Sequence, residues 1–248
     1  MSLETSFAPP RIAPTATTPI PHHTVLARVN VSATEFQDRT GINLERLRRR
    51  SEIQAVVSPR DMKRIEEVTL MPAWYRDQLL RCVTLVGDET EHIYENARMF
   101  LSMVDPSRVR LGQRYVYRSR YMSIVECLPN LFQQFSLVPG FSRIPMSVMF
   151  GEDADGRPVI GNYLPPIVEV HNNQYELMDG CHRGFLGRQA GHAVEMLVIE
   201  GVSVPFPCET RDWAHVSIRD RKPDRVEDRF WELDQQLFRN LKHIGIDG

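Results

Sequence analysis

Apolar residues in the first half of the chain recur about every three to four positions, which is the spacing of one face of a helix. Two such stripes lie at residues 75–86 and 93–104. They predict a helical region, built as a small bundle, over residues 32–106. Residues 1–31 are instead rich in proline and threonine, so we expect an extended or disordered arm there.

The pattern changes after Pro106, where short apolar runs bounded by turn residues replace the helical stripes. Four of these runs predict strands, at residues 144–150, 166–170, 174–178 and 194–200. Asn172 and Asn173 favour a tight turn between two strands. A short helix is predicted over residues 182–190, with Gly191 in the position where helices stop.

The last part of the chain returns to helical spacing. Its apolar positions are Val226, Phe230, Leu233, Leu237, Leu241 and Ile244. They predict a long amphipathic helix that packs on the core or on a second copy of the chain, as in a homodimer. We therefore expect an α+β fold with a mixed-sheet core over residues 107–205 and a C-terminal helical segment over residues 206–248.

The charge balance disfavours a protein whose main task is to hold duplex DNA. Lysine and arginine total 30, and aspartate and glutamate total 32, for a net charge of −2. Chains that hold DNA usually carry a clear positive excess. Two basic stretches, residues 46–50 and the arginines between 108 and 120, could still contact phosphates. Nucleic-acid binding is therefore disfavoured but stays open.

The cysteines and the N-terminus favour a cytoplasmic protein. The four cysteines are Cys82, Cys127, Cys181 and Cys208. They are far apart and have no zinc-binding spacing, so we expect reduced thiols. The N-terminus lacks the basic and apolar regions of a secretory signal. No apolar run approaches the roughly 20 residues that span a bilayer, so we expect no membrane partner.

The most informative segment is residues 175–185, which read YELMDGCHRGF. A predicted strand ends before Gly180, a tight turn follows, and a helix begins near His182. Such a turn points free backbone N–H groups at one place, where the helix dipole also favours negative charge. Arg183 adds a planar, permanently charged donor set that suits phosphate oxygens. The segment therefore predicts an anion site, and the anion bound at such sites is most often a phosphate.

Three other side chains of this segment carry possible chemistry. Asp179 is its carboxylate and could accept a proton from a substrate hydroxyl or hold Mg²⁺ that bridges nucleotide phosphates. The helix start and the neighbouring arginine should lower the pKa of the Cys181 thiol and favour thiolate. His182 could donate to a phosphate or shuttle a proton. The plainer alternative is that Asp179 caps the helix and His182 is a surface residue.

The sequence also resembles the ParB/sulfiredoxin superfamily. The resemblance rests on LPPIVEV at residues 164–170, on the DGCHR box at residues 179–183, and on the helix and apolar strand that follow. It implies a mixed-sheet core that binds a nucleotide, ATP or another nucleoside triphosphate. The superfamily includes partition proteins that bind CTP and DNA, sulfiredoxins, and kinases that phosphorylate free serine.

The free-serine kinases carry Asp-Gly-x-His-Arg, which residues 179–183 match. The resemblance implies an ATP-dependent phosphotransferase that acts on a small molecule, such as a free amino acid or a biosynthetic intermediate. Asp179 would be the catalytic base or Mg²⁺ ligand, and His182 and Arg183 would stabilise charge on the transferred group. These kinases have a second acid upstream, for which Glu126 and Glu169 are candidates. Glu169 is equally expected as an outward-facing strand residue.

Two alternatives stay open. Sulfiredoxins carry Gly-Gly-Cys-His-Arg, so ATP-dependent thiol chemistry at Cys181 is one of them, although Asp179 and Gly184 depart from that pattern. The other alternative is a nucleotide-dependent DNA-binding or regulatory protein of the ParB type, although no downstream helix-turn-helix domain is visible. For each of these hypotheses, Arg118, Ser119 and Arg120 are candidate phosphate contacts.

Overall fold

The computed structural model describes residues 20–30, 33–39, 53, 55–120, 122 and 145–246 of the chain. Most of the predicted arm lies outside these residues. Its last part forms strand β1 (Ile20–Pro21) and helix α1 (His22–Arg28). The basic stretch at residues 46–50 lies outside the described residues, as do Glu126 and Cys127.

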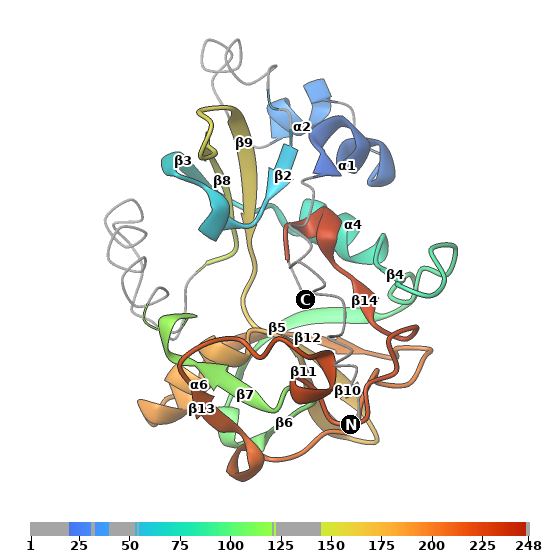
Figure 1. Ribbon diagram of the computed structural model, residues 1–248. Helices are drawn as coiled ribbons and strands as arrows, with labels where there is room; N and C mark the ends of the chain where they lie inside the picture. Colours follow the sequence, from blue (N-terminus) through green and yellow to red (C-terminus); the bar gives the residue numbers. More distant parts are fainter. Residues whose placement is uncertain are drawn as a thin grey trace, which may run out of the picture.

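Two five-stranded mixed sheets organise the described chain (Figure 1). The first sheet has the order β1, β2 (Ala55–Val57), β9 (Pro158–Tyr163), β8 (Ser147–Glu152) and β3 (Arg64–Leu70). The second sheet has the order β5 (Arg98–Val104), β12 (Val194–Glu200), β10 (Ile167–His171), β11 (Gln174–Asp179) and β6 (Val109–Leu111). The chain passes from the first sheet to the second between β3 and β5, and again between β9 and β10.

Shorter elements cover these sheets. The described residues include the further helices α2 (Ala33–Arg39), α4 (Ala73–Arg81) and α6 (Cys181–Gln189), and residues 118–120 are also helical. Two small ladders pair β4 (Thr84–Leu85) with β14 (Arg239–Asn240) and β7 (Tyr115–Tyr117) with β13 (Ser217–Arg219). The 3-10 turns are η1 (Pro59–Asp61), η2 (Pro106–Arg108), η4 (Trp213–His215), η5 (Val226–Asp228) and η6 (Lys242–Ile244).

Strands β10 and β12 of the second sheet are largely buried on both faces. Ile167 and Leu197 belong to one core, which also holds apolar residues of the first sheet such as Ile160. Their neighbours Val168 and Val198 belong to a second core, which includes side chains of α6 and of the C-terminal segment. Successive side chains of a strand point to opposite faces. Burial of both faces therefore explains why β10 and β12 are nearly continuous apolar runs.

The α+β class and the local elements of the second half are confirmed. Strands β8, β10, β11 and β12 and helix α6 lie within a few residues of their predicted positions. Asn172 and Asn173 join β10 to β11 with positive φ angles of 49° and 62°. That is the backbone conformation of a type I′ hairpin turn, for which asparagine is favoured.

The predicted helical bundle over residues 32–106 is largely wrong. Tyr75 and Leu79 do lie buried on α4, but that helix ends at Arg81. The second stripe contains β5, which pairs antiparallel with β12 along its whole length. Pairing with a distant strand thus overrides the local helical spacing, since such apolar residues also suit a pleated surface.

The long C-terminal helix is also wrong. Residues 226–244, which carry the apolar stripe, form η5, β14 and η6 with irregular chain between them. Of the six apolar residues at helical spacing, Leu241 and Ile244 are at most 5% exposed in the first core, and the other four are only partly buried. Dimerisation through that helix therefore loses its structural basis. No helix among the described residues has the length and apolar character to cross a membrane.

Candidate anion site at the start of helix α6

Gly180 makes the sharp turn between β11 and α6. Its φ angle is +92°, in the left-handed region that favours glycine. A Cβ atom there would lie 2.7 Å from the Cβ atom of Pro166, the residue before β10. Both the backbone conformation and this close approach therefore require glycine. The glycine lets the turn of the DGCHR box pack directly on Pro166, at the start of the Pro-Ile strand.

The turn leaves the first amide groups of α6 pointing out of the helix end. The N–H of Gly184 donates to the carbonyl of Gly180 at 2.8 Å, which closes the first turn. The N–H groups of residues 181–183 come before Gly184 along the chain, so they have no acceptor within the helix. Together with the helix dipole, they form the strand–turn–helix geometry that attracts anions. Anion binding itself stays a prediction.

Arg183 ties the start of α6 to the connection between the two sheets. One guanidinium nitrogen lies 2.6 Å from a carboxylate oxygen of Asp179, and another donates to the carbonyl of Leu164. The guanidinium also lies over the ring of Tyr163, with 5.4 Å between the guanidinium carbon and the ring centroid. Arg183 therefore fixes the orientation of the Asp179 carboxylate as well as adding positive charge.

His182 is held as a neutral ring. The backbone N–H of Tyr117 donates to its Nε2 atom at 3.1 Å, so the proton of the neutral ring is on Nδ1. Burial, followed by three nearby positive charges, lowers the pKa of His182 to about 3. Those charges belong to Arg120, Arg183 and Lys222. The predicted proton shuttle near neutral pH is therefore wrong, but Nδ1–H can still donate to a phosphate.

Cys181 is a core residue and not a thiolate. Its side chain is 6% exposed and belongs to the core between α6 and the second sheet. Its Sγ atom lies 3.9 Å from the carbonyl oxygen of Tyr115. Burial, and to a lesser degree the charge of Asp179, raises the pKa of the Cys181 thiol well above its usual value. The predicted low pKa is wrong, because the helix end does not offset the loss of water.

The three predicted phosphate contacts that follow β7 lie near the site but differ in their surroundings. Arg118 is exposed and forms a 4.0 Å ion pair with Asp220, and Ser119 is also exposed. Arg120 is partly buried, and its charge acts on His182. Sequence reasoning missed Lys222, since only the parallel pairing of β13 with β7 brings its segment here.

Glu169 does not face outward, and it does not lie in this site. Its side chain is 0% exposed and forms a two-bond ion pair with Arg239, at 2.8 and 2.7 Å. It also accepts hydrogen bonds from the hydroxyl of Tyr94 and, at 2.6 Å, bonds the ring of His171. The ion pair and these bonds lower the pKa of Glu169 despite its burial. It is a structural acid that joins β10 to the C-terminal segment.

Among the described residues, no cluster of three or more histidine, cysteine, aspartate or glutamate side chains could hold a metal ion. Asp179 ends β11 two residues before α6 and so supplies a carboxylate at the turn into the helix. Comparison with protein-family models, with curated proteins and with solved structures gives no match for this chain.

Proposed function

We propose that this protein is an ATP-dependent phosphotransferase that acts on a small hydroxyl-bearing molecule and holds the nucleotide phosphates at the start of α6. The observation that carries the proposal is the arrangement around His182. The first N–H groups of α6 have no acceptor within the helix, Arg183 stands in its first turn, and the charges of Arg120 and Lys222 act on the same His182 ring. Polyphosphates are the common ligands that match several fixed N–H groups together with several cations.

The phosphate contacts would come from groups that are already positioned. The amides of residues 181–183 would donate to oxygens of the phosphate chain, as would Nδ1–H of His182. The neutral state of His182 suits this role, because it leaves one defined donor whose partner nitrogen accepts from Tyr117. Such preorganised donors stabilise the charge that develops on a transferred phosphoryl group.

Asp179 would act at the reacting end of the nucleotide. Arg183 bonds one of its carboxylate oxygens, which fixes the side chain and leaves the other oxygen for a ligand or a substrate hydroxyl. Magnesium is usually bound by one or two carboxylates and by the substrate phosphates. A single aspartate therefore fits Mg²⁺, which would neutralise phosphate charge. The other role of Asp179 is to accept the proton of the acceptor hydroxyl.

The thiol alternative has little structural support. A sulfiredoxin-type reaction needs a reactive thiolate, whereas the Cys181 thiol is buried and its pKa is raised. The DNA-binding or regulatory alternative shares the nucleotide site and differs only in lacking turnover. It is therefore an outcome of the same test.

The test combines calorimetry with phosphorus NMR. We would measure binding of ATP and CTP with Mg²⁺, then follow nucleotide turnover with and without a panel of free amino acids and related hydroxyl compounds. Turnover that depends on one acceptor is the expected result. D179N should abolish that turnover, whereas the matched control D155N, on an exposed hairpin of the first sheet, should not. Binding without turnover by any acceptor would contradict the transferase assignment, and no binding would overturn the site.

A further inference from the structure

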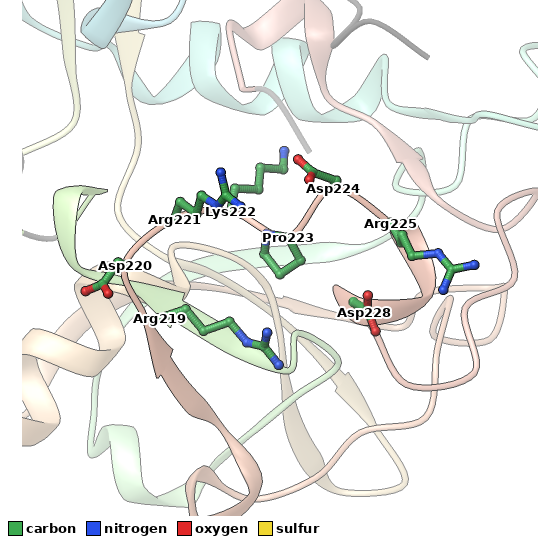
Figure 2. Close-up of a pocket in the computed structure, with 8 residues that line it drawn as sticks. All are labelled: Arg219, Asp220, Arg221, Lys222, Pro223, Asp224, Arg225 and Asp228. Atoms are coloured by element: carbon green, nitrogen blue, oxygen red, sulfur yellow. The ribbon is translucent and has the colours of Figure 1, made fainter. Parts of the chain in front are cut away.

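The segment between β13 and η5 is a charged loop that follows the strand paired with β7. This basic loop, residues 219–225, holds Arg219, Arg221, Lys222 and Arg225 along with Asp220 and Asp224. With Asp228 it lines a hollow of about 510 Å³ (Figure 2). The function proposed above uses only the charge of Lys222, so this segment needs an account of its own.

The basic loop is held in shape by the chain around it. The Arg229 guanidinium donates to the carbonyls of Pro223 and Asp224 at 2.8 and 2.9 Å. The Arg114 guanidinium donates to the carbonyl of Glu227 at 2.9 Å, just beyond the loop. These bonds fix the backbone before any ligand arrives, which lowers the entropy cost of binding.

Strand pairing places the loop against the candidate anion site. β13 runs parallel to β7, with Arg219 opposite Tyr117, the residue whose N–H bonds His182. One residue beyond the end of each strand, Asp220 forms an ion pair with Arg118. The beginning of the basic loop therefore lies beside the chain that contacts His182, and the charge of Lys222 reaches this ring.

We infer that the basic loop forms the outer wall of the phosphate site and that Lys222 binds the outer phosphates of the nucleotide. Lysine is a compact charge on a long flexible stem, which suits contact with a phosphate chain that extends beyond the helix end. The loop carries nearly as many carboxylates as cations. The strand pairing that sets the start of the loop beside Tyr117 and Arg118, and not the net charge of the loop, carries the inference.

This inference rests on the proposed function, so the test must separate the two. We would titrate ATP and inorganic triphosphate into the wild type, K222A, K222R and K63A by calorimetry. Lys63 is an exposed lysine before β3 in the first sheet, which makes K63A a matched loss of one charge. We expect K222A to weaken binding of both ligands about tenfold or more, since charge-assisted hydrogen bonds are strong. K63A should stay within about twofold of the wild type, and K222R should recover part of the affinity.

The outcomes are distinct. If the wild type binds neither ligand, the proposed function and this inference both fail. If the wild type binds ATP and triphosphate, and K222A binds them with the same affinity as K63A, then only the role of Lys222 fails. A second readout needs no ligand: the pKa of His182, measured by NMR of its ring, should rise in K222A because a nearby positive charge is removed. An unchanged pKa would place Lys222 away from the site and overturn the inference.

Discussion

Acidification should destabilise the protein through His182, and the size of the effect follows from its surroundings. The pKa of this ring is about 3 in the folded chain and 6.5 when it is fully solvated. Below pH 6.5 the unfolded chain therefore binds a proton that the folded chain does not bind. The free energy of unfolding is highest above pH 6.5 in this respect and decreases as the pH falls toward 3. A pH of about 5 lies about 1.5 units below the unfolded-state pKa, which lowers the free energy of unfolding by about 2 kcal/mol.

The perturbation that isolates this effect is H182Q. Glutamine can place an oxygen near the position of Nε2, so it can accept from the N–H of Tyr117 but cannot titrate. Urea unfolding at about pH 7.5 and about pH 5 should show that the wild type loses about 2 kcal/mol more stability than H182Q does. The control H192Q changes an exposed histidine after α6 and should behave as the wild type.

The comparison also separates His182 from the rest of the chain. Burial lowers the pKa of His243 as well, so the wild type has more than one source of acid sensitivity. This second source is common to the wild type and to H182Q and cancels in the difference. Equal losses in the two proteins would refute the burial and the cation cluster that we assign to His182.

Three further substitutions test other parts of the structure. C181S should keep nucleotide binding and turnover, and iodoacetamide should label Cys181 only in denaturant, as seen by mass spectrometry; labelling of the native chain would contradict its burial. E169A should lower the free energy of unfolding by about 3–5 kcal/mol, because it leaves Arg239 buried without its partner. The nucleotide affinity of the folded fraction should not change. A variant that is stable but inactive would instead indicate that Glu169 is a catalytic acid. G180A should destabilise more than G201A, by about 1–3 kcal/mol. Both glycines have positive φ, but only at Gly180 does a Cβ atom meet Pro166, so equal losses in urea unfolding would exclude that clash.

Local features of the second half were predictable from the sequence because neighbours along the chain determine them. The turn at Asn172 and Asn173, the left-handed turn at Gly180 and the stop at Gly191 each depend on the conformational preferences of one residue type. The apolar runs on either side then identify strands and a helix. These elements contain the whole DGCHR box, which is why the helix start was located correctly.

Features that depend on distant pairing were not predictable from the same patterns. β5 is a strand only because β12, far along the chain, lies beside it. The segment that carries Lys222 lies beside the chain that contacts His182 only because β13 pairs with β7 across about a hundred residues of sequence. Cys181 shows a different failure: its local surroundings favour thiolate, but the apolar core around it decides its pKa. Burial is a property of the whole fold.

The central claim is that the start of α6 holds nucleotide phosphates, and backbone NMR tests it most directly. In a titration with ATP and Mg²⁺, the amide signals of residues 181–183 should shift strongly and saturably, with the same affinity that calorimetry gives. Amides of the first-sheet hairpin at residues 153–157 should stay in place. If ATP binds while the amides of residues 181–183 do not move, or if no amide of the chain responds, the helix start is not a phosphate site.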